Sequence, residues 1–348
     1  MPERIRFNSA SRYRPALAWF AAIAAGWVFV LVMLGAFTTS IGAGMIFPDW
    51  PLSNGSLSPD GWLRNAAMFA EHAHRLSAGI MSAATLWLAA ALWICEERRW
   101  LRRLGWSAVA LVALQAIVGG LRVLLDPVNV PAVDTSAGQV FAMLHACLAQ
   151  TFVCVLLAIA AALSRPWIEV ASGSSPSVPA RLRLLGVICC ALLLVQLAIA
   201  SVMRHSFAGL AIPTFPLAPG GRLLPAHWNF GIGINFAHRA MALVLAVALG
   251  WLAQAVWRNP AAGRGWKSLA SLVVVFVGVQ IGLGASVIWT ARNPYFTTAH
   301  VVVGALTLSA TFMLTWVMHR DVLEDFSEIS EVGCRGQNPT VARIPVRA

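Results

Sequence analysis

Apolar residues run through this chain in long stretches, separated by shorter segments rich in arginine, proline and glycine. Each stretch reaches the length of about 20 residues that an α-helix needs to cross the hydrocarbon core of a bilayer. We therefore predict an all-α polytopic membrane protein with eight membrane-spanning helices. The helices are expected to begin near Leu17, Ala70, Leu104, Gln139, Leu182, Gly233, Ser268 and Thr297.

The composition supports a membrane protein and argues against a nucleic-acid partner. Hydrophobic residues make up 59% of the 348 residues and charged residues only 11%, whereas a soluble domain carries about a quarter charged residues. The net charge of +11 comes from arginines in short segments between apolar stretches. Such segments are typical of the loops of a membrane protein. Membrane lipid, and no nucleic acid, is therefore the expected surrounding.

The placement of arginine and lysine predicts an orientation. Positive charges gather before the first apolar stretch, after the second, fourth and sixth, and in the tail from Arg320 onward. The remaining connections between apolar stretches hold only scattered positive charges. Because positively charged loops stay in the cytoplasm, both termini are expected to be cytoplasmic. The short segment before the first stretch favours a multi-pass protein of the bacterial inner membrane over an organelle protein.

The two halves of the chain resemble each other at nearly one offset. This repeat predicts two pseudo-symmetric four-helix bundles side by side, at residues 1–168 and 181–320, with a linker at 169–180 and a cytosolic tail at 321–348. The matching positions are Gly44 to Leu52 with Gly209 to Leu217, His74-Arg75 with His238-Arg239, Gln115 with Gln280, and Gly119 with Gly284.

Each half places one histidine near the start of its second helix and one near the start of its fourth. The pairs are His74 with His145 and His238 with His300. Both helices of a pair run in the same direction, so the two imidazoles are expected at similar depth. Two imidazoles without a carboxylate or thiolate cluster suit haem iron, whereas zinc takes three or four protein ligands. A polar contact inside the bundle explains one such histidine, but four at repeated positions favour two haem sites.

The remaining polar groups near these histidines differ in their expected roles. His72 lies about 200° around the helix from His74, so it cannot bind the same iron. We also expect His205 and His319 not to be iron ligands. Arg75 and Arg239, which follow a ligand candidate directly, are of the type that pairs with haem propionates.

Glu71 is the main difference between the halves, because Asn235 stands at the matching position. It lies three residues before His74, on the same helix face, so its carboxylate is expected beside the haem edge. A carboxylate there accepts protons or stabilises a developing cation. The alternative is a helix cap, since negative charge is favoured at a helix start. The first half is therefore expected to carry acid–base chemistry.

These features resemble the haem A synthases, membrane proteins of cytochrome oxidase assembly. The resemblance rests on the two four-helix halves, the loop Pro48-Asp-Trp-Pro-Leu52, the Glu-x-x-His-Arg motif from Glu71 to Arg75 and the paired histidines. Many members of that family carry a cysteine pair flanking the loop sequence. Here Phe47 and Ser53 stand at those positions, so the chain resembles a member without the pair.

The resemblance implies an oxidoreductase that oxidises the C8 methyl group of haem O to a formyl group, which gives haem A. His74 and His145 would flank the iron of the substrate haem, with Glu71 as the catalytic carboxylate. His238 and His300 would hold the iron of a haem b cofactor that passes electrons onward. The resemblance also implies haem O synthase and cytochrome oxidase subunit I as partners, with an electron acceptor that the sequence does not identify.

Two other functions fit parts of the pattern. A dihaem b-type membrane protein that transfers electrons would use the same four histidines. Glu71 and the inequality of the halves favour the enzyme over it. A transporter built from repeats places its substrate groups at mid-membrane, whereas here the polar groups gather at the helix ends.

Overall fold

The protein is described by a computed structural model that covers residues 13–130, 135–169 and 178–324. Eight helices in these residues are long and apolar enough to cross a membrane, which confirms the predicted fold class. Most of the predicted linker and tail lies outside the described residues, so the proposed domain boundaries stay predictions. The eight helices are α1 (Pro15–Ser40), α2 (Ala66–Cys95), α3 (Arg99–Leu124), α4 (Ala137–Leu163), α6 (Ala180–His205), α7 (Phe230–Arg258), α8 (Arg264–Trp289) and α9 (Pro294–Met318).

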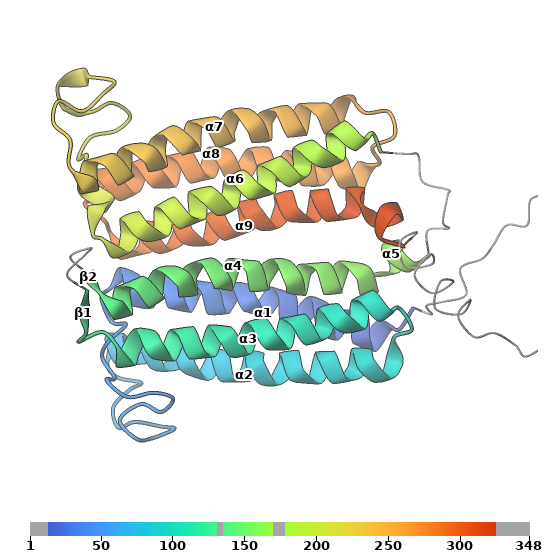
Figure 1. Ribbon diagram of the computed structural model, residues 1–348, viewed down its shortest axis with the longest axis horizontal. Helices are drawn as coiled ribbons and strands as arrows, with labels where there is room; N and C mark the ends of the chain where they lie inside the picture. Colours follow the sequence, from blue (N-terminus) through green and yellow to red (C-terminus); the bar gives the residue numbers. More distant parts are fainter. Residues whose placement is uncertain (1–12, 131–134, 170–177, 325–348) are drawn as a thin grey trace, which may run out of the picture.

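Short elements occupy the connections. β1 (Asn129–Val130) pairs antiparallel with β2 (Thr135–Ser136) just before α4. The one-turn helix α5 (Arg165–Ile168) follows α4, and the 3-10 turns η2 (Ala208–Leu210) and η3 (Pro219–Gly221) lie in the long loop before α7. None of these elements reaches into the helical bundle (Figure 1).

The long helices begin a few residues before the expected starts, and in α2, α4, α7 and α9 a polar side chain outside the apolar stretch caps the helix. The Asn65 side chain accepts the N–H groups of Ala67 (3.0 Å) and Met68 (3.1 Å) at the start of α2. Asn229 does the same for Ile232 (2.8 Å) at the start of α7. Asparagine is among the favoured capping residues. Since Asn65 caps α2, the alternative role of Glu71 as a helix cap is excluded.

The helices form two groups of four that lie side by side (Figure 1). In each group every helix packs against its neighbours in the chain, and the first helix also packs against the fourth. Each group encloses its own apolar cluster. The groups meet along a seam where α4 and α9 contact each other, α1 contacts α9 and α4 contacts α6. In the apolar stretches of α4 and α9, 50% of the residues are buried inside the protein, against 11% in α8. The helices α4 and α9 therefore form the centre of the molecule.

One end of the bundle carries both long loops, residues 41–65 and 206–229, together with the β1–β2 hairpin (Figure 1). We call it the loop end. The start of α1, the end of α9 and the connections from α2 to α3 and from α7 to α8 lie at the opposite end. Because consecutive helices run in alternate directions, α2, α4, α7 and α9 all start at the loop end. The four predicted ligand histidines are near these four starts, so the fold brings them to one end of the molecule.

Candidate functional site

Glu71 and Arg75 lie one turn apart on α2 and fix the first long loop. They form a buried ion pair in which Arg75 Nη2 is 2.6 Å from Glu71 Oε1. Glu71 Oε2 accepts the backbone N–H groups of Ile46 (2.8 Å) and Phe47 (3.2 Å). The carboxylate of Glu71 therefore binds Arg75 with one oxygen and the backbone of the loop with the other. Arg75 donates to three loop carbonyl oxygens, those of Phe47 (3.0 Å), Asp49 (2.7 Å) and Leu52.

His72 anchors the same loop and faces away from the ligand candidates. Its Nδ1 is 2.9 Å from Ser53 Oγ, and its Nε2 is 3.1 Å from the carbonyl oxygen of Leu57. Its ring lies 4.7 Å from the ring of Trp62, and the side chain is almost completely buried. Phe47 is also fully buried. Phe47 and Ser53 stand where the family resemblance places a cysteine pair. Phe47 thus takes part in packing, and Ser53 forms a hydrogen bond with His72.

Asp49 stabilises the tip of this loop. Its carboxylate accepts the N–H groups of Asn54 (2.8 Å) and Gly55 (2.7 Å). Burial acts to raise the pKa of Asp49, but these N–H donors and the charge of Arg75 outweigh it and hold the pKa below its ordinary value. The loop sequence Pro48 to Leu52, on which the family resemblance rests, is therefore ordered through its acidic residue.

The second half anchors its loop in the same way, with one change of charge. Asn235 Nδ2 donates to the carbonyl oxygens of Ala208 (2.9 Å) and Gly209 (3.0 Å). Arg239 Nε donates to Asn235 Oδ1 at 2.9 Å, and its Nη atoms donate to carbonyl oxygens of the second long loop. The arginine of the first half is thus neutralised by a carboxylate on its own helix, whereas the arginine of the second half binds a neutral amide.

The predicted histidine pair of the second half is brought together. The ring centroids of His238 and His300 are 6.3 Å apart, with 63° between the ring planes. Two imidazoles that bind one iron from opposite sides have centroids about 6 Å apart, because each nitrogen lies about 2 Å from the metal and about 1 Å from its ring centre. His74 and His145 of the first half also lie close enough for their charges to interact. The rings of His238 and His300 thus face each other, whereas the role of the four histidines as iron ligands stays a prediction.

Glycines on neighbouring helices make room for three of the four rings. A Cβ added at Gly119 would lie 2.8 Å from His145 Cε1, and one added at Gly284 would lie 3.2 Å from His300 Cε1. A Cβ at Gly35 would lie 2.8 Å from His74 Cε1. Gly119 and Gly284 are matching positions of the internal repeat, which explains why that match includes a glycine.

The nitrogen atoms of these rings suit a metal that brings most of its own ligands. The buried rings of His74 and His300 lie beside the backbone of Leu31 and of Gln280, respectively, and His300 Nε2 is 3.4 Å from Gln280 Nε2. His145 Nδ1 lies 3.2 Å from the carbonyl oxygen of Gln115, which leaves its Nε2 for a metal. The described residues contain no group of three or more histidine, cysteine, aspartate or glutamate side chains that could hold a metal ion. Haem, whose porphyrin supplies four ligands, fits this donor set better than zinc does.

The sequence does not predict the contacts of three arginines at the loop end, Arg122, Arg204 and Arg292. Arg122 Nη1 donates to the carbonyl oxygen of Gly44 at 3.2 Å, and Arg292 packs on Gly209, the repeat partner of Gly44. The two arginines lie near matching glycines but do not align in the sequence, because Arg292 follows α8 whereas Arg122 is within α3. Arg204 of α6 crosses the seam and donates to Ser40 Oγ of α1 at 2.9 Å.

Two further histidines that we expected not to bind iron, His205 and His319, lie outside the two pairs. His205 is the last residue of α6, beside Arg204, at the loop end of the bundle. His319 follows α9 at the opposite end, where its Nδ1 is 2.8 Å from the carbonyl oxygen of Thr315. Neither is part of the two ring pairs.

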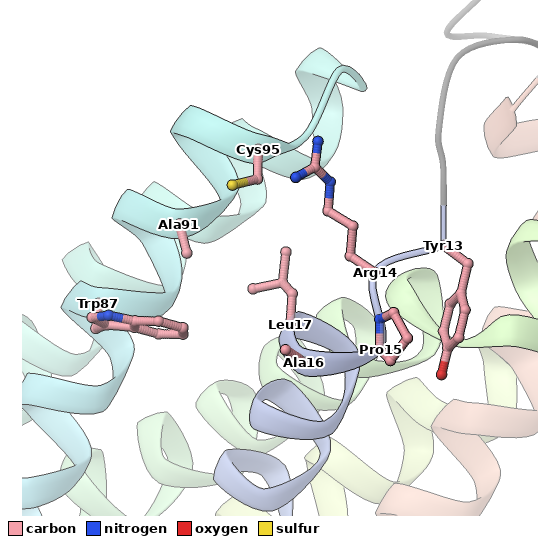
Figure 2. A pocket seen from close by; sticks show the side chains of 8 residues that line it. All are labelled: Tyr13, Arg14, Pro15, Ala16, Leu17, Trp87, Ala91 and Cys95. Atoms are coloured by element: carbon pink, nitrogen blue, oxygen red, sulfur yellow. The ribbon is translucent and has the colours of Figure 1, made fainter.

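A pocket between α1 and α2 lies far from these pairs. Figure 2 shows its lining, which includes Leu17 at the start of α1 and Trp87, Ala91 and Cys95 near the end of α2. Cys95 follows His74 by a separation that corresponds to about 30 Å along a helix. The pocket therefore lies at the end of the bundle opposite the histidines and is no part of the candidate haem site.

The COX15-CtaA family, described as cytochrome oxidase assembly protein, matches residues 18–312. The chain belongs to this family. Among its relatives, the haem A synthase of Geobacillus kaustophilus is 29% identical over 304 residues, which cover 82% of this chain and 86% of the relative. The haem A synthase of a Methylobacterium species is 24% identical over 341 residues, covering 87% and 92% of the two chains.

A third family member, the haem A synthase of Geobacillus thermodenitrificans, is 27% identical over 295 residues. The match to the COX15-CtaA family spans helices α1 to α9 and so includes both histidine pairs and both anchored loops. Membership therefore applies to the whole eight-helix unit and not to one half alone.

Proposed function

We propose that this protein is a haem A synthase, which oxidises the C8 methyl group of haem O to a formyl group. The observation that carries the proposal is the pair of facing histidine sites at one end of the bundle, of which only one has a carboxylate on the helix face of its ligand. Family membership and the haem A synthase names of the relatives support it.

The two histidine pairs take different haems in this proposal. His74 and His145 bind the iron of the substrate haem O, and so fix the substrate near the start of α2. His238 and His300 hold a haem b cofactor, which supplies one-electron transfer when bound. The pairing of His238 with His300 at 6.3 Å supports this assignment. The contact of His145 Nδ1 with the carbonyl oxygen of Gln115, at 3.2 Å, also supports a ligand role, because it leaves Nε2 of that ring to bind iron.

Glu71 serves as the proton acceptor of the reaction. Oxidation of a methyl group to a formyl group removes four electrons and breaks two C–H bonds, so the reaction needs an electron acceptor and a group that takes up protons. Glu71 is buried, lies on the face of α2 that carries His74 and is bound to Arg75. It also holds the loop over the site through Ile46 and Phe47, so loop position and proton transfer depend on one side chain.

The remaining predictions concern partners and surroundings. Arg75 and Arg239 stay candidates for pairing with haem propionates, although their recorded partners are loop carbonyl oxygens and Glu71 or Asn235. The bacterial inner membrane, with both termini in the cytoplasm, is the proposed location. Haem O synthase and cytochrome oxidase subunit I are the proposed partners for delivery of the substrate and use of the product.

Co-expression with a source of haem O tests the proposal. Haems extracted from cells are analysed by mass, for the intact protein and for Glu71→Gln, which keeps an oxygen for the loop N–H groups but removes the charge. We expect haem A with the intact protein and haem O without haem A in the variant. Haem b alone in both samples, with a reversible bis-histidine spectrum, would instead assign the protein as a dihaem electron-transfer protein.

A further inference from the structure

Arg122, Arg204 and Arg292 gather positive charge at the loop end, and we call them the arginine cluster. Arg204 lies close enough to both of the others for their charges to interact. None of the three forms an ion pair with a carboxylate among the described residues. Because like charges repel and a guanidinium group loses hydration free energy when it leaves water, such a cluster indicates an anionic ligand.

Each arginine of the cluster keeps N–H groups for a ligand. Arg122 donates through Nη1 to the carbonyl oxygen of Gly44 at 3.2 Å, whereas its Nε and Nη2 have no partner among the described residues. Arg204 donates through Nη2 alone, to Ser40 Oγ (2.9 Å) and to another oxygen of α1 (2.8 Å). Arg292 forms no side-chain hydrogen bond in the part of the chain that the structure describes. Because a guanidinium group carries more N–H groups than these contacts use, the cluster retains donors.

Arg122 lies beside the histidine pair of the first half. It follows Gly119 by three residues on α3, which places both residues on one face of the helix. Gly119 faces the ring of His145, since a Cβ added there would lie 2.8 Å from His145 Cε1. Arg122 is therefore about one helical turn closer to the loop end than this contact. The charge of Arg122 also reaches His74 and His145.

Arg204 lies beside the histidine pair of the second half. Ser40 Oγ, which accepts a hydrogen bond from Arg204, also accepts one from the hydroxyl of Thr298 at 3.2 Å. Thr298 precedes His300 by two residues, so Ser40 joins Arg204 to the segment of α9 that carries His300. The charge of Arg204 also reaches His300. The cluster thus spans the seam, with one arginine beside each histidine pair.

Two carboxylates approach Arg122 without forming an ion pair with it. Glu71 and Asp126 lie near enough for their charges to interact with Arg122. Glu71 is bound to Arg75 instead, and Asp126 Oδ1 accepts the hydroxyl of Ser136 at 3.4 Å. Even if both carboxylates are counted, they balance only Arg75 and Arg122, so the charge of the rest of the cluster remains.

The arginines that follow the ligand candidates directly have few donors left. Both Nη atoms of Arg75 are bonded, to Glu71 and to carbonyl oxygens of the first long loop. Every side-chain nitrogen of Arg239 donates a hydrogen bond, to Asn235 or to the second long loop. An anion near the histidine pairs therefore finds more available donors in the arginine cluster.

We propose that the arginine cluster binds the propionate groups of both haems, with Arg122 at the first-half site and Arg204 and Arg292 at the second-half site. The proposal rests on the proposed function, in which each histidine pair holds a haem. Propionates are carboxylates, which guanidinium groups bind through parallel N–H···O bonds. Each haem is then held at its iron by histidines and at its charged edge by the cluster. Because the cluster spans the seam, it also brings the charged edges of the two haems near each other.

Binding of haem b and of its dimethyl ester tests this proposal on the full-length chain. The ester lacks the negative charge of the propionates but keeps the iron. Apo-protein from cells that make no haem is titrated with each compound, and the bis-histidine absorbance spectrum reports binding. Each site is titrated alone, the first in His238→Ala and the second in His74→Ala. We expect each site to bind haem b about tenfold or more tightly than the ester, because hydrogen bonds between charged groups contribute that much.

Substitutions within the cluster separate propionate binding from helix packing. Arg204→Gln is expected to weaken binding of haem b at the second site about tenfold and to leave binding of the ester unchanged. Arg122→Gln is expected to have the same effect at the first site. The control is Arg64→Gln, which removes an exposed arginine of the first long loop and is expected to keep the preference for haem b at both sites.

The outcomes distinguish this proposal from the proposed function. Equal affinity for haem b and its ester at both sites would overturn the role of the cluster. A preference that Arg122→Gln and Arg204→Gln leave unchanged would overturn it too, as would an equal loss of both ligands, which is the result of damaged packing. None of these results affects the proposed function, which fails if the intact protein binds haem without a bis-histidine spectrum.

Discussion

At the scale of single residues, Glu71 and Asn235 occupy the same place in the two halves but carry different charge. Each side chain bridges an arginine four residues later and the backbone of a long loop. Only Glu71 neutralises its arginine, so only the first half places an ion pair under its loop. The same position therefore serves loop attachment in both halves and offers a carboxylate in one.

This difference predicts unequal costs of truncation. Glu71→Ala leaves the largely buried guanidinium of Arg75 without its counter-charge, which lowers the free energy of unfolding by about 3 kcal/mol. Asn235→Ala removes the hydrogen bonds of an uncharged side chain and is expected to lower the free energy of unfolding by about 1 kcal/mol. Thermal unfolding in detergent measures both. A smaller loss for Glu71→Ala than for Asn235→Ala contradicts the buried ion pair.

The glycines beside the histidines give a second residue-scale prediction. Gly119→Ala places a methyl group 2.8 Å from His145 Cε1, so the ring must shift, at a cost of about 1–3 kcal/mol. We expect lower haem content at the first-half site, measured by absorbance and haem extraction. Gly278→Ala is the control, since an added Cβ there meets nothing within 4 Å. Equal haem content in the two variants would show that the glycine is not needed for the ring.

The sequence predicts the four ligand histidines because they recur at repeated positions. It does not reveal that Gln196 of α6 lies 3.0 Å from His238 Nδ1. The residue that matches Gln196 in the first half is Leu31, so the internal repeat does not mark the position. It also does not reveal that Arg75 is bound to loop carbonyl oxygens. That contact depends on how the loop folds back over α2, which no pattern of polar and apolar residues describes.

At the scale of elements, the long loops are parts of the site rather than connections. The first loop is fixed by Glu71, Arg75 and His72 of α2, and its tip is ordered by Asp49. The sequence predicts the eight helices well because a span of apolar residues has few alternatives in a membrane. It places their starts too late because capping residues such as Asn65 and Asn229 precede the apolar residues.

The loop is expected to loosen in acid. Because the pKa of Asp49 is lowered below its ordinary value of 3.8, the carboxylate stabilises the loop fully above that value and loses the effect as the pH falls through the lowered pKa. Limited cleavage by pepsin between pH 5 and pH 2 measures it. Asp49→Asn is expected to be cleaved faster than the intact protein at about pH 5 and equally fast near pH 2. A constant ratio of the two rates would contradict the role of Asp49.

At the scale of the whole molecule, the two halves meet through the helices that carry one histidine of each pair. His145 is on α4 and His300 is on α9, and these two helices contact each other along the seam. Arg204 of α6 and Thr298 of α9 both bond to Ser40 of α1 at the loop end of this seam. The two candidate haem sites therefore lie on helices that meet at the seam, an arrangement that suits electron transfer between the two haems of the proposed function.

The central claim is that the two histidine pairs hold different haems. The most direct measurement is mass analysis of the haems bound to purified His74→Ala and His238→Ala after expression with a source of haem O. We predict that His74→Ala keeps haem b and loses haem O and haem A, whereas His238→Ala loses haem b and keeps the haem of the first site. Equal loss of both haems in either variant, or the same haem at both sites, would contradict the assignment.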